Sequence, residues 1–130
     1  MIDFRSNEGI IKDMRITETF FDDSVLFMII AYSSKNQVGA IKGIIKGDSA
    51  YLGDIDIPKR YVSIGIGTRL IKLFEDKCFR RGIKEIKGDL SKVDLDHKDR
   101  LLHFYDKNGY QITYENDENP NYWGKIYKKL

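Results

Sequence analysis

The stretch that most constrains the fold is Arg60–Leu70, "RYVSIGIGTRL", where the periodicity of the sequence changes. Before it, apolar and polar residues alternate in "YLGDIDIP", which predicts a strand that stops at Pro58. After it, from Thr68, apolar residues recur at spacings of three and four, which predicts an amphipathic helix. Gly65 and Gly67 lie between the two patterns, although glycine weakens helices. The chain must either turn sharply here or let another group approach its backbone closely.

Two further strands are expected upstream of this stretch. "SVLFMIIAYS" is apolar and β-branched, and "QVGAIKGIIKG" alternates; short turns separate them from each other and from "YLGDIDIP". Strands joined by such short turns predict an antiparallel meander. At the N-terminus, Met14 and Ile16 alternate with polar residues and favour a strand. Ile10, Met14 and Phe21 also fit one face of a helix, so both interpretations stay open.

Downstream, the first helix is expected to end at Gly82, a suitable residue for the left-handed position after a helix. "IKEIKGDL" predicts a strand. Asp94 or Asp96 can cap a second helix that ends at Asn108 and Gly109, and "YQITYE" and "YWGKIYKKL" predict the last two strands. The order predicts an α+β (mixed α/β) fold. The strands flanking the first helix are expected to be parallel, joined by a right-handed crossover.

Bulk properties limit the classes of protein and of partner. The chain has 130 residues, which suits a single domain over 1–130, and a net charge of +2 without a basic block, which argues against nucleic acid. Its longest apolar run, from Val25, falls short of the ~18 residues of a membrane span. A single cysteine, Cys78, excludes an internal disulfide, and His97 and His103 lack the spacing of metal ligands. We therefore expect a soluble cytoplasmic domain without a metal site.

The glycines have two interpretations on their own. Free N–H groups and the positive end of the dipole at a helix N-terminus favour a phosphate, which glycines allow to approach. The other interpretation is a tight turn without a ligand. A dinucleotide-binding motif fails because its third glycine position is Leu70, and a P-loop sequence is absent.

Three stretches resemble the GNAT superfamily of acetyl-CoA-dependent N-acetyltransferases. "YLGDIDIPKRYVSIGIGTRLIKLFE" is similar to the family's fourth strand, pyrophosphate turn (Q/R-x-x-G-x-G/A) and helix. "IKEIKGDL" follows in the place of the fifth strand. "FYDKNGY" is similar to the F-Y-x-K-x-G-F/Y signature. The resemblance implies a mostly antiparallel twisted sheet, a splay between the parallel fourth and fifth strands, and helices on both faces.

By this resemblance, the cofactor is acetyl-CoA, and backbone groups of the glycine turn hold the pyrophosphate of coenzyme A. The main chain of Ile55 and Ile57 would pair with the pantetheine arm, and the Ile57 N–H would stabilise the oxyanion. Lys98 stands where many members carry an asparagine that touches the cofactor. The implied turn residues are Val62, Ser63, Ile64, Gly65, Ile66, Gly67 and Thr68. Val62 replaces the family's Arg or Gln, and the candidate to compensate for this loss is Arg60 or Arg69.

The catalytic candidates are one phenol and two carboxyl groups. Tyr105 matches the family's tyrosine and would protonate the leaving thiolate. Asp54 and Asp56 alternate on one strand face together with Leu52, and either, Asp54 first, could take the proton of the amine. They could instead attract a cationic substrate, and the amine could lose its proton without a dedicated base.

The expected reaction is direct acetyl transfer to a primary amine in a ternary complex. The acceptor side would be open, which suits an exposed amine of a peptide or protein, or closed by a second subunit in a homodimer, which suits a small-molecule amine. The main alternative is a catalytically silent acyl-CoA-binding or regulatory module on the same fold, suggested by Val62 and Lys98. An interaction domain without any coenzyme is the third hypothesis.

Overall fold

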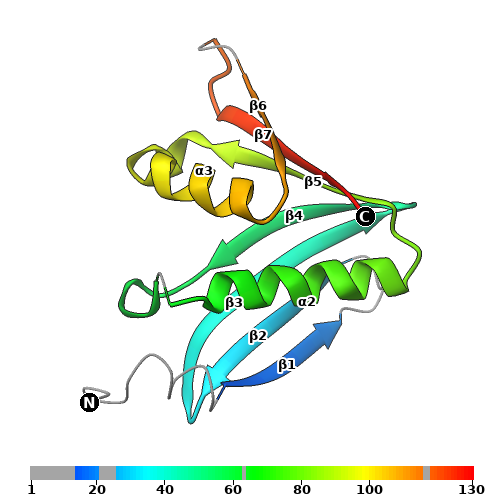
Figure 1. Cartoon of the computed structure of the whole chain (residues 1–130), viewed down its shortest axis with the longest axis vertical. Helices are drawn as coiled ribbons and strands as arrows, with labels where there is room; N and C mark the ends of the chain where they lie inside the picture. The colour runs from blue at the N-terminus through cyan, green and yellow to red at the C-terminus, as the bar shows by residue number, and fades with distance from the viewer. Residues whose placement is uncertain (1–13, 21–25, 63, 116–117) are drawn as a thin grey trace.

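The computed structural model describes residues 14–20, 26–62, 64–115 and 118–130, without the side chains of 18–20 and 93–95. Its first half is an antiparallel meander of β1 (Met14–Phe20), β2 (Leu26–Ser33), β3 (Asn36–Lys46) and β4 (Ser49–Asp56) (Figure 1). The strand interpretation of Met14 and Ile16 is therefore confirmed. The competing helix also needed Ile10 and Phe21, which lie outside the described residues.

The second half alternates helices and strands. It contains α2 (Ile66–Arg80), β5 (Glu85–Ser91), α3 (Lys98–Lys107), β6 (Gln111–Tyr114) and β7 (Tyr122–Lys129). Short 3₁₀ turns, η1 (Lys59–Tyr61) and η2 (Lys92–His97), precede the two helices. In the part of the chain that the structure describes, the seven strands form one sheet with the order β1-β2-β3-β4-β5-β7-β6, in which β4 and β5 pair in parallel. The predicted α+β class and the parallel crossover are confirmed.

The helix boundaries differ from expectation at both N-termini. α2 begins at Ile66 rather than Thr68, because Gly65 is its N-cap residue. The prediction that Asp94 or Asp96 caps α3 is wrong: the N-cap residue is His97, which makes no side-chain capping bond. The reason is that η2 already winds residues 92–97 into a helical turn that runs into α3. At the C-termini, Gly82 and Gly109 adopt the predicted left-handed conformation, with φ of 80° and 86°.

The core lies between the helices and one face of the sheet, which we call the helix face. The Phe74 ring of α2 stacks on Phe27 of β2 with centroids 5.0 Å apart. Gly43 of β3 leaves room for this ring, since a Cβ there would lie 2.5 Å from Phe74. The fully buried residues of this layer include Ile29, Ile41, Ala50, Leu70, Ile71, Cys78 and Ile86.

The two described helices lie beside each other on the helix face. A Cβ on Gly67 of α2 would lie 3.2 Å from the Phe104 ring of α3, and Figure 1 shows both helices in front of the sheet. The expected helices on both faces are thus not found within the described residues.

Candidate functional site

A cleft opens where β4 and β5 separate. Their pairing runs from Ser49 opposite Glu85 to Leu52 opposite Gly88 and then stops. β4 continues to Asp56 along β3, and β5 continues to Ser91 along β7. Beyond Leu52, the edge of β4 that faces β5 therefore pairs with none of the described strands. The cleft has a volume of about 640 Å³ and is lined from β4, the glycine turn, β5 and α3.

Most of the residues predicted from the sequence meet in this cleft. Its lining includes Asp54, Ile55, Asp56, Ile57, Val62, Gly65, Gly67, Thr68 and Tyr105. Ile64 and Lys98 are not among the lining residues, and the Ile66 side chain is buried in the core. Ser63 lies outside the described residues. Segments about fifty residues apart in sequence thus contribute to one site.

The glycine turn starts α2 with a residue in the left-handed conformation and without a side-chain cap. Gly65 has φ of 94°, which L-residues rarely adopt, and no side chain caps the helix. The first helical bond joins the Arg69 N–H to the Gly65 carbonyl at 3.1 Å. The N–H groups of Ile66, Gly67 and Thr68 consequently have no acceptor within the helix, and the helix dipole adds partial positive charge there.

Asp54 and Asp56 of β4 do not lie on the face that the alternation of the sequence predicts for them. Leu52 pairs with Gly43 and Asp54 with Lys42, so Gly53 is an extra residue that forms a β-bulge. Gly43 points to α2, so Leu52 shares the helix face, whereas Asp54 and Asp56 point to the opposite face. The prediction that Leu52 shares their face is wrong because the bulge changes the phase of the alternation.

The opposite face of the cleft carries a third carboxylate that the sequence analysis missed. Gly88 of β5 shares the helix face with its partner Leu52, so its neighbour Asp89 points to the same face as Asp54 and Asp56. All three aspartates line the cleft and are exposed. Only the strand register shows this, because Asp89 lies more than thirty residues away in sequence.

Tyr105 reaches the cleft from α3. Its side chain is 8% exposed, and its ring contacts Phe104 and Tyr110 edge-on at centroid distances of 5.3 and 5.6 Å. Tyr110 is buried, and its hydroxyl donates a hydrogen bond to Glu75 Oε2 at 3.0 Å. Burial is the main cause that raises the pKa of Tyr110, and the negative charge of the Glu75 carboxylate raises it further. Of these two tyrosines, Tyr105 is the one that lines the cleft.

Lys98 packs against aromatic rings, and Cys78 is enclosed in the core. The Lys98 ammonium lies over the Trp123 ring, 5.0 Å from its centroid, and 5.7 Å from that of Tyr114. Cys78 is a fully buried free thiol, and burial raises its pKa to about 12. Neither residue lines the cleft. Cys78 is therefore protonated and unreactive at neutral pH.

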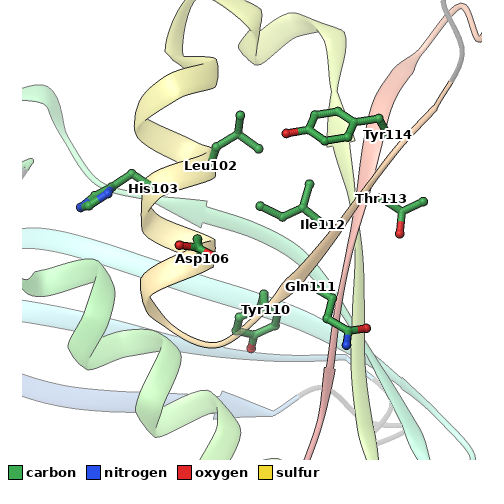
Figure 2. Close-up of a pocket in the computed structure, with 8 residues that line it drawn as sticks. All are labelled: Leu102, His103, Asp106, Tyr110, Gln111, Ile112, Thr113 and Tyr114. Carbon is green, nitrogen blue, oxygen red and sulfur yellow. The ribbon is translucent and has the colours of Figure 1, made fainter.

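α3 also presents basic residues to the cleft. Arg100, His103 and Lys107 line it and are exposed, at spacings of three and four along the helix. Figure 2, a view of a second hollow between α3 and β6, shows the His103 ring pointing away from β6. Their spacing was visible in the sequence, but only the structure shows that this side of α3 faces the glycine turn.

Within the described residues, no three His, Cys, Asp or Glu side chains are grouped closely enough to bind a metal ion. Neither described helix has the length and hydropathy needed to span a membrane.

The splayed sheet with a glycine turn at its cleft defines the class of acyl-coenzyme A-dependent transferase folds, and comparisons with known proteins agree. A model of the acetyltransferase (GNAT) family matches residues 3–110. The chain belongs to this family.

One relative matches over part of the chain. YocC, an uncharacterized protein of Bacillus subtilis, is 33% identical over 72 residues, which are 55% of this chain and 42% of YocC. The chain thus spans less than half of that relative.

Solved structures share the fold. The PaiA N-acetyltransferase of Thermoplasma acidophilum, in complex with coenzyme A, superposes with a TM-score of 0.67 at 21% identity, over 81% of this chain and 61% of that one. The IAA acetyltransferase of Bacillus cereus has a TM-score of 0.70 at 10% identity, over 90% and 99% of the two chains.

Proposed function

We propose that this protein is an acetyl-CoA-dependent N-acetyltransferase that transfers the acetyl group directly to a primary amine. The observation that carries the proposal is the cleft at the splay. It combines the unpaired edge of β4, the glycine turn and the Tyr105 side chain. A long anionic thioester cofactor needs this combination: donors for its phosphates, an edge for its amide-containing arm and an acid near its sulfur.

The cofactor would lie along β4 with its diphosphate at the glycine turn. Backbone N–H groups of residues 64–68 would bind the phosphate oxygens, and the Thr68 hydroxyl could add a donor. The pantetheine amides would pair with the free edge around Ile55 and Ile57, as an added strand would. Val62 lines the cleft but offers no side-chain donor.

In the proposed reaction the neutral amine attacks the thioester carbonyl, a C–N bond forms and the C–S bond breaks. The Ile57 N–H would stabilise the carbonyl oxygen as negative charge develops on it. Tyr105 would donate its hydroxyl proton to the departing thiolate. Asp54, or Asp56, would accept the proton that the amine loses, directly or through water.

The acceptor side favours a cationic amine. Asp54, Asp56 and Asp89 all point to the face opposite the helices, so an amine that enters there meets three carboxylates. A small amine or the exposed amine of a peptide or protein suits this entrance.

The first test is calorimetric titration of acetyl-CoA into the wild type and two glycine variants. Gly65→Glu should abolish binding, because it puts a carboxylate where the diphosphate would lie. Gly82→Glu is the matched control, since Gly82 also has a positive φ but lies at the other end of α2 with no atom within 4 Å of a Cβ. Equal binding by the wild type and both variants, or no binding by the wild type, would refute the proposal.

Val62 supports one alternative, a catalytically silent acyl-CoA-binding module. Binding of acetyl-CoA without acetylation of any amine, across a panel that includes diamines and peptides, would favour that alternative. Release of free thiol that depends on an added amine would favour the enzyme.

A further inference from the structure

We infer that the stripe of Arg100, His103 and Lys107 on α3 binds the 3′-phosphate of coenzyme A. The protein would then select the complete coenzyme over its dephospho form. The inference deepens the proposed function and rests on it.

The geometry starts from the position of Phe104. Its ring touches Gly67 at the first turn of α2, so this part of α3 faces the glycine turn directly. Arg100 lies one helical turn before Phe104 and Lys107 nearly one turn after it, while His103 is adjacent. With a rise of about 1.5 Å per residue, the stripe extends for about 10 Å along the cleft. A ligand held at the glycine turn therefore lies beside the stripe.

Positive and negative side chains of the cleft lie on different faces of the sheet. The basic residues of α3 lie on the helix face, whereas Asp54, Asp56 and Asp89 point to the opposite face. Within the described residues, none of the stripe residues takes part in an ion pair. The anionic, phosphate-bearing end of a ligand is accordingly favoured on the helix side.

The number of phosphates identifies the group that the stripe would bind. The N–H groups of the glycine turn suffice for a diphosphate, and Val62 contributes nothing further. Coenzyme A carries a third phosphate on its ribose. This dianionic group suits an exposed guanidinium and an exposed ammonium that form no ion pair with any other described residue. By contrast, neither residue expected to compensate for Val62 lines the cleft: Arg60 stacks on Tyr61 at 5.2 Å, and Arg69 is exposed on α2.

The experiment compares the affinities of coenzyme A and dephospho-coenzyme A by calorimetry. The proteins are the wild type, the double variant Arg100→Gln/Lys107→Gln, and the control Lys72→Gln, an exposed lysine of α2 outside the cleft. We expect the wild type to prefer coenzyme A by about tenfold. The double variant should lose this preference, and Lys72→Gln should keep it. Thermal melts verify that the variants, changed only at exposed positions, remain folded.

The outcomes separate the two proposals. If the wild type binds both ligands equally, or if the double variant weakens both equally, the assignment to the 3′-phosphate is wrong while the coenzyme site stands. If the wild type binds neither ligand, the proposed function fails and this inference with it.

Discussion

Tyr105 and Tyr110 are five residues apart, and their surroundings give them different roles. Tyr105 lines the cleft, whereas the Tyr110 hydroxyl is committed to Glu75 in the core. We expect Tyr105→Phe to lower kcat about 100-fold, with little change in the affinity for acetyl-CoA, because the leaving thiolate loses its acid. Steady-state kinetics with calorimetry tests this. Unchanged turnover in Tyr105→Phe would exclude the phenol as the acid.

The matched variant is Tyr110→Phe, which should keep kcat near the wild-type value but lower the free energy of unfolding by about 1 kcal/mol. The pKa of Tyr110 is raised in the folded state, so its contribution to stability is complete below the unfolded pKa of about 10 and declines at higher pH. Denaturant titrations should therefore show a smaller alkaline loss of stability in Tyr110→Phe than in the wild type.

At the scale of elements, the position of α2 depends on how closely it packs on β3. A Cβ at Gly43 would lie 2.5 Å from the Phe74 ring, which is fully buried and stacked on Phe27. Gly43→Ala should therefore cost about 1–3 kcal/mol of stability through overpacking, measured by urea unfolding. Gly53→Ala, where the nearest atom is 3.5 Å from the new Cβ, should change stability by less than about 0.5 kcal/mol. A similar loss in both variants would contradict this packing argument.

For the whole molecule, the splay leaves few hydrogen bonds between the two halves of the sheet, since the pairing of β4 with β5 ends at Leu52. A bridge from β7 to α2 joins the two halves: Lys128 Nζ lies 3.0 Å from Glu75 Oε2 and 2.8 Å from the Asn108 carbonyl oxygen. The Lys128 side chain is only 24% exposed and that of Glu75 only 12%. This bridge connects β7 and the C-terminal end of α3 to α2.

Lys128→Met should lower the free energy of unfolding by about 1–3 kcal/mol, since it leaves a largely buried carboxylate without its cation. The control Lys125→Met lies on the same strand and breaks an exposed ion pair with Glu115, so it should cost about 0–1 kcal/mol. Thermal and denaturant unfolding measure both. Equal stability of the two variants would show that the bridge contributes no more than a surface pair.

Local patterns predicted most of the elements. The change from alternation to a helical period located the glycine turn, and the "NG" after Lys107 ended α3 as predicted, because both depend on neighbouring residues. Residues that match family motifs, such as Gly65 and Tyr105, did meet in one cleft. The capping of α3 was mispredicted because η2 precedes it.

By itself, the sequence determined the α+β class, the order of the strands and helices, and the glycine turn, since these follow from periodicity and backbone preference. Only the tertiary structure decided which side chains face each other across the cleft. The bulge at Gly53 turned Asp54 and Asp56 away from Leu52, and strand register brought Asp89 to the same face. The packing of Phe104 on Gly67 directed Arg100, His103 and Lys107 toward the glycine turn. Such contacts depend on register and packing between distant segments, for which a single sequence carries no local pattern.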